Sequence, residues 1–69
     1  MKKDKLAKAV ITKRIDKNLS LEECARQIGI SYLTMWKIED GYTSLSYETI
    51  KKIASFLEVS EKEVRGMLW

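Results

Sequence analysis

The side chains with the clearest capacity for chemistry gather between residues 31 and 37. The set joins two hydroxyls, two aromatic rings, a leucine and a lysine, namely Ser31, Thr34, Tyr32, Trp36, Leu33 and Lys37. Tyr32 and Trp36 are one helical turn apart, so their rings can pack against sugars or thymine methyl groups while the tyrosine hydroxyl reaches a phosphate. Lys37 adds a cation that can reach a phosphate or a guanine edge. These groups suit contacts to a phosphate-bearing surface.

Residues for catalysis or metal binding are scarce. The chain has no histidine and a single cysteine, Cys24, and it has no glycine-rich phosphate loop. Its carboxylates fall mainly on the exteriors and caps of predicted helices. We therefore expect no enzyme activity, no cofactor, no metal and no small-molecule ligand. For Cys24 we favour a buried thiol that acts as a small hydrophobe over a redox role.

A helix is predicted to begin at Leu21, because Ser20 and Glu23 have the spacing of a capping box. It should end before Gly29, which can adopt the left-handed conformation common after a helix. Three small or apolar residues at helical spacing would face inward: Cys24, Ala25 and Ile28.

A second short helix is predicted over about residues 32–39, with Ser31 as its cap. Met35 and Ile38 should face inward, which leaves the residues named first on its other faces. Two helices joined by a short turn form a helix-turn-helix unit, here about residues 21–40. In DNA-binding proteins the second helix of this unit lies in the major groove.

A longer pattern extends beyond these two helices. It comprises Ala25 and Gly29 four apart, an apolar set (Cys24, Ile28, Ile30, Met35, Ile38), the run Ile38-Glu39-x-Gly41, and Ser46-x-Glu48-Thr49-Ile50-x-x-Ile53-Ala54-x-x-Leu57-x-Val59-Ser60. Over residues 10–60 the chain resembles the lambda Cro and phage-repressor (Xre-type) helix-turn-helix family. The resemblance implies an all-α, compact five-helix, lambda-repressor-like domain that binds double-stranded DNA.

Three further helices complete this expectation, over about residues 4–16, from after Ser46 to Glu58-Val59, and from 61 to the chain end. The first has two apolar stripes, of which only part is expected to face the core. The inward residues predicted for the other two are Ile50, Ile53, Ala54, Leu57, Val64, Met67 and Leu68. With no proline, no strand pattern and only 69 residues, the chain should form one domain over residues 1–69.

Positive charge is concentrated near the N-terminus. Residues 1–17 hold seven Lys or Arg and two Asp, so this segment carries +5 and the rest of the chain −2. Two readings of Lys2, Lys3 and Lys5 stay open, phosphate contacts and a merely solvated face. No long apolar stretch follows, so we expect a cytoplasmic protein without a membrane segment.

The predicted contact surface departs from the family. Family members often have glutamine at the first residue of the second helix and polar residues early in the third, whereas this chain has Leu21, Tyr32 and Leu33. We therefore expect base selection that is mostly apolar and shape-based. Trp36 has an alternative role, packing over the domain edge or in a protein interface.

Arg14 and Glu39 are expected to stabilise the domain. By resemblance they align with an arginine of the first helix and a glutamate that ends the third, which pair across the domain. Such a charge pair would fix the position of the second helix of the motif.

The C-terminal residues Met67, Leu68 and Trp69 are unusually apolar for a solvent-exposed end. We expect them to contact a second copy of the chain, with burial of Trp69 in its own core as the alternative. A symmetric homodimer would place its two recognition helices about 34 Å apart and bind an inverted repeat.

These inferences favour a DNA-binding transcriptional regulator, and a repressor that acts by occlusion, since no separate effector domain is evident. The resemblance suggests a bacterial, phage or mobile-element setting. The competing interpretation is a protein-interaction module, antitoxin-like or an adaptor, that uses Tyr32, Leu33 and Trp36 to grip another protein. Salt-dependent affinity for duplex DNA would separate the two. It also remains open whether the chain is one domain of a longer protein.

Overall fold

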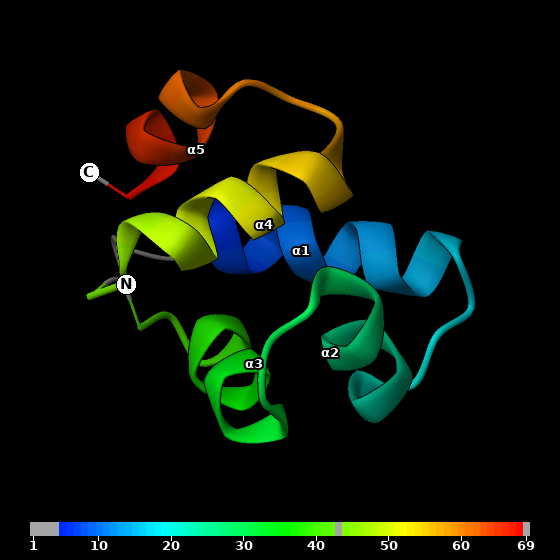
Figure 1. Cartoon of the computed structure of the whole chain (residues 1–69). Helices are drawn as coiled ribbons and strands as arrows, with labels where there is room; N and C mark the ends of the chain where they lie inside the picture. Colours follow the sequence, from blue (N-terminus) through cyan, green and yellow to red (C-terminus); the bar gives the residue numbers. More distant parts are fainter. Residues whose placement is uncertain (1–4, 43, 69) are drawn as a thin grey trace.

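The computed structural model describes residues 5–42 and 44–68, and within them it contains five helices and no strand (Figure 1). The helices are α1 (Lys5–Asp16), α2 (Leu21–Ile28), α3 (Tyr32–Glu39), α4 (Tyr47–Leu57) and α5 (Glu61–Met67). The expected all-α fold of five helices is confirmed.

Serine caps explain why four of these helices begin where they do. In each case the hydroxyl oxygen accepts the backbone N–H three residues on, at 3.0–3.2 Å, and the four caps are Ser20, Ser31, Ser46 and Ser60. Glu23 and Glu63 complete two capping boxes by accepting the backbone N–H of Ser20 and Ser60. The hydrogen bond from the backbone of Ser20 is the main reason that the pKa of Glu23 is lowered.

The helix ends are less regular. Gly29 ends α2 at φ 92°, as its residue type predicts, and its N–H donates to the Ala25 carbonyl at 2.8 Å. Glu58 ends α4 at φ 61°, a left-handed conformation without the help of glycine. Asp40 directly follows α3.

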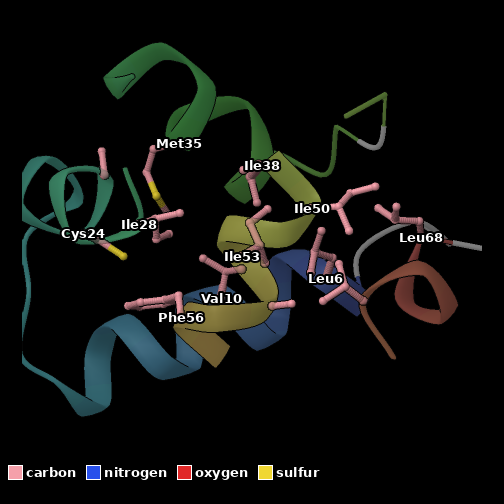
Figure 2. Packing of buried hydrophobic residues seen from close by; sticks show 13 residues of the cluster. Leu6, Val10, Cys24, Ile28, Met35, Ile38, Ile50, Ile53, Phe56 and Leu68 are labelled. Carbon is pink, nitrogen blue, oxygen red and sulfur yellow. The ribbon is translucent and has the colours of Figure 1, made fainter. Parts of the chain in front are cut away.

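One apolar core joins all five helices, and its members include Leu6, Val10, Cys24, Ile28, Met35, Ile38, Ile53 and Val64 (Figure 2). In α4 the predicted inward residues Ile50, Ile53 and Ala54 are buried and Leu57 packs against the core, but the prediction left out Phe56, which is also buried. Phe56 follows Ile53 by three residues and so shares its side of the helix. In α1 the core face ends early, and Ile15 is exposed.

The arrangement of the helices leaves α3 at the surface. Figure 1 shows α2 and α3 on one side of the molecule, α5 on the other, and α1 and α4 between them. In agreement, α3 packs against α1 and α2, while α5 packs against α1 and α4. No helix in the described ranges is long and apolar enough to cross a membrane.

Candidate nucleic-acid interface

The position of α3 follows from the turn that precedes it. The N–H groups of Gly29 and Ile30 both donate to the Ala25 carbonyl, at 2.8 and 3.0 Å, and this closes the end of α2. α3 then begins at Tyr32 and packs across α2. Met35 and Ile38 anchor its inner side and are almost fully buried, pointing toward the core in Figure 2.

The opposite side of α3 is open. Tyr32, Leu33 and Trp36 are 56%, 61% and 52% exposed, and Lys37 is also exposed. These four residues are called the outer face of α3 below. Because a helix has about 3.6 residues per turn, Leu33 lies near the middle of this face, between Trp36 and Lys37.

The two hydroxyl residues expected at this site are engaged with each other. Ser31 Oγ accepts the backbone N–H of Thr34 at 3.0 Å and donates to Thr34 Oγ1 at 2.9 Å. Thr34 is half-buried. Both residues lie beside the outer face, but their hydroxyls serve first to start the helix.

Lys37 points toward the segment that follows α3. Its Nζ lies 5.2 Å from the centre of the Tyr42 ring, and Tyr42 is itself half-exposed. Both residues line a hollow of about 200 Å³ between α3 and the start of α4. The hollow is completed by Thr34, Ser44, Leu45, Ser46 and Thr49.

The sequence alone did not indicate that Tyr42, Ser44 and Thr49 belong to the site. They reach it because the segment between α3 and α4 brings the start of α4 beside Lys37. A helix N-terminus and a lysine together favour an anion such as a phosphate, although Glu48 in the first turn of α4 offsets part of that field. In this region the sequence predicted only the helix cap at Ser46. A cap does not indicate which residues of the rest of the fold lie beside the start of the helix.

The N-terminus of α3 resembles that of α1 and differs from those of the other three helices in having no carboxylate in its first turn. α2, α4 and α5 each carry at least one glutamate in the first turn, and α3 carries no acidic residue there. The positive end of the α3 dipole is therefore not offset by a carboxylate within its own first turn.

At the other end of α3, Arg14 and Glu39 form the pair that the family resemblance implies. Arg14 Nε and Nη2 donate to the two oxygens of Glu39 at 2.7 and 3.1 Å, and Nη1 donates to the Leu19 carbonyl at 3.1 Å. Both side chains are partly buried. The hydrogen bond to Glu39 is the main cause of the raised pKa of Arg14. The guanidinium thus ties α3 to α1 and to the turn before α2.

Trp36 has a neighbour on its α2 side. With Leu21, Glu39 and Asp40 it lines a hollow of about 200 Å³. Leu21 is partly buried and packs against the core, so the hollow has apolar walls at Leu21 and Trp36 and carboxylates at Glu39 and Asp40.

The remaining site residues lie elsewhere. Met67 is half-buried and Leu68 is buried in the core, both at the α5 side of the molecule, away from α3 (Figure 1). Trp69, Lys2 and Lys3 lie outside the described residues, and Lys5 is exposed at the start of α1. Cys24 is buried, and this burial raises the pKa of its thiol. The described ranges contain no cluster of three His, Cys, Asp or Glu that could hold a metal ion.

Comparison with known proteins identifies the family. A family model described as "Helix-turn-helix" matches residues 10–64, which include α2, α3, α4 and most of α1. No curated protein matches the chain. The match covers well over half of the sequence and agrees with the two capped helices and the exposed outer face of α3. The chain belongs to the Cro/C1-type, Xre-like helix-turn-helix family, whose members are DNA-binding regulators.

Proposed function

We propose that this protein is a transcriptional regulator that binds a specific sequence of double-stranded DNA by inserting α3 into the major groove. The observation that carries the proposal is the two-sidedness of α3. Met35 and Ile38 fix the helix to the core, and its opposite side exposes Tyr32, Leu33, Trp36 and Lys37. In proteins with this motif, that side of the second helix meets the base edges.

Each residue has a distinct part in this proposal. Tyr32, Leu33 and Trp36 face the bases and sugars, and Lys37 contacts a phosphate. Ser31 and Thr34 hold the start of α3, whose positive end points to the DNA backbone. The hollow beside Lys37 gives that phosphate a place between α3 and α4.

We further propose a homodimer on an inverted-repeat operator, acting as a repressor by occlusion in the cytoplasm, with residues 1–69 as one domain. Met67, which we assign to the interface with Leu68 and Trp69, lines a groove of about 420 Å³ between α1 and the α4–α5 region. The longest dimension of the domain is 27 Å. Two domains side by side are therefore small enough to place their recognition helices about one duplex turn, or about 34 Å, apart. Because Leu68 is buried within its own chain, Met67 and Trp69 would supply most of the contact.

A second candidate function is a protein-interaction module, such as an antitoxin-like protein or an adaptor. The observation in its favour is the apolar character of the outer face, since exposed Leu and Trp side chains are also what a protein partner would bury. In that case Lys37, whose ammonium group lies near Tyr42, would contact no phosphate.

Selection of duplexes from a random library tests the proposal against this candidate. Enrichment of an inverted repeat, with affinity that falls steeply as salt is raised, would support a sequence-specific dimer. Recovery of no preferred sequence, with only weak binding, would exclude specific DNA readout and favour the interaction module.

A further inference from the structure

The outer face of α3 is short of the groups that distinguish bases by paired hydrogen bonds. Arginine, asparagine and glutamine are the side chains that form two hydrogen bonds to one purine, and α3 contains none of them. The one glutamine of the chain, Gln27, and the arginine nearest in sequence, Arg26, belong to α2. Specificity must then come from other contacts.

The hydrogen-bonding groups that are present are partly committed. The hydroxyls of Ser31 and Thr34 bond to each other, and the Nζ of Lys37 lies over the Tyr42 ring at the edge of the hollow between α3 and α4. Lys52, from α4, donates its Nζ to the Gly29 carbonyl at 2.9 Å, at the turn before α3. The Tyr32 hydroxyl and the Trp36 indole N–H remain, and each offers a single donor.

What the face offers in quantity is apolar surface. Leu33 lies at its centre and Trp36 beside it, and both are more than half exposed. In the major groove, the C5-methyl group of thymine is the apolar group among the features that distinguish the base pairs. An apolar patch carried into that groove by a rigid helix therefore has one natural counterpart.

We infer that this protein selects its operator by the C5-methyl groups of thymine, which Leu33 and Trp36 cover in the major groove. The inference rests on the proposed DNA-binding function and adds the chemical feature that is read. It expects thymine at the positions of each half-site that face the middle of α3.

At each such position, the affinities for four versions of the selected duplex are compared. The comparison separates the effect of the methyl group from the effect of hydrogen bonding. Thymine and uracil differ only by the C5-methyl group. 5-Methylcytosine and cytosine differ by the same methyl group, but both carry the hydrogen-bonding groups of cytosine. Loss of one buried methyl group is expected to weaken binding about three- to fivefold. The same ratio is expected between 5-methylcytosine and cytosine.

A variant of the protein completes the test. Leu33→Ala should bring the thymine-to-uracil ratio close to one at the position that Leu33 covers. The matched control is Ile15→Ala, because Ile15 is an aliphatic side chain with a similar exposure, 63%, on α1. This control should leave the ratio unchanged, and circular dichroism verifies that both variants are folded.

The inference and the proposed function fail in different ways. If uracil-containing duplexes bind as tightly as thymine-containing ones at every position, the methyl readout is wrong while specific DNA binding stands. If the wild-type ratio persists in Leu33→Ala and in Trp36→Ala, the methyl groups are read by other residues and the inference is overturned. If no sequence is enriched at all, the proposed function itself is wrong.

Discussion

At the scale of single residues, the side chains of α3 fall into two groups, those that pack the helix against the core and those that are exposed on its opposite side. Helical spacing alone separated the two groups, since Met35 and Ile38 are buried and Leu33 and Trp36 are exposed. The spacing could not show that the hydroxyls of Ser31 and Thr34 bond to each other, because that depends on rotamers at the helix start. It also missed the burial of Phe56, since a stripe read from one helix cannot show how widely its neighbours cover that helix.

The pair between Arg14 and Glu39 is expected to contribute to stability more than to DNA contact. Glu39→Ala removes both acceptors from a partly buried guanidinium and should lower the free energy of unfolding by about 2 kcal/mol. For a domain of this size that lowers Tm by about 8–16 °C. Thermal unfolding measures the change, with Asp40→Ala as a control because its carboxylate is exposed in the next position. Unchanged Tm with lost DNA binding would instead place Glu39 at the functional surface.

Lys37 is expected to contact a phosphate and not a base. Lys37→Ala should weaken binding to all duplexes by a similar factor and reduce the slope of log affinity against log salt by about 1. Lys51→Ala is the matched control, because Lys51 also lies over a tyrosine ring, 5.5 Å from the centre of Tyr47, but on α4. Fluorescence anisotropy over a salt series gives both quantities. Loss of preference at a single guanine would show that Lys37 reads a base after all.

At the scale of helices, the starts were predictable and the ends less so. A serine followed three residues later by Glu or Thr fixes each start locally, which is why the caps at Ser20, Ser31, Ser46 and Ser60 could be read from the sequence. The end of α4 has no such signal, because Glu58 takes a conformation that glycine would favour. The segment between α3 and α4 was also unreadable, although it brings the start of α4 beside Lys37.

Glu58 therefore marks a position where stability can be gained. Glu58→Gly should raise the free energy of unfolding by about 0.5–1 kcal/mol, since the left-handed conformation strains a residue with a Cβ more than glycine. The contact of Glu58 with Lys13 is long, at 3.6 Å, and the Glu58 side chain is 75% exposed, so this pair contributes little. Denaturant unfolding checks the gain, and Glu58→Gln separates charge from backbone strain. Equal gains in both variants would contradict the explanation from strain.

At the scale of the whole molecule, the fold places the two proposed contact regions on different sides. α3 carries the outer face and α5 carries Met67, with α1 and α4 between them (Figure 1). The family resemblance predicted this architecture as a whole, whereas periodicity alone would have given five helices without their arrangement. The contact between two copies depends on the surfaces of both. The sequence pattern of one chain does not specify that contact.

Self-association through the end of α5 is expected to raise stability. In a dimerising protein Tm increases with protein concentration, because the partner binds the folded state. Trp69→Ala and Met67→Ala should shift sedimentation toward the monomer and flatten this dependence. Ile15→Ala, an exposed apolar change on α1, serves as the control. Unaffected self-association in both interface variants would exclude this surface.

The central claim is that α3 gives this protein specific affinity for one DNA sequence. The most direct measurement is the affinity of the wild-type protein for its best selected duplex and for a scrambled duplex of the same composition, at the same physiological salt concentration. We predict binding to the selected duplex at least about a thousandfold tighter than to the scrambled one. Equal affinities for the two duplexes would contradict it.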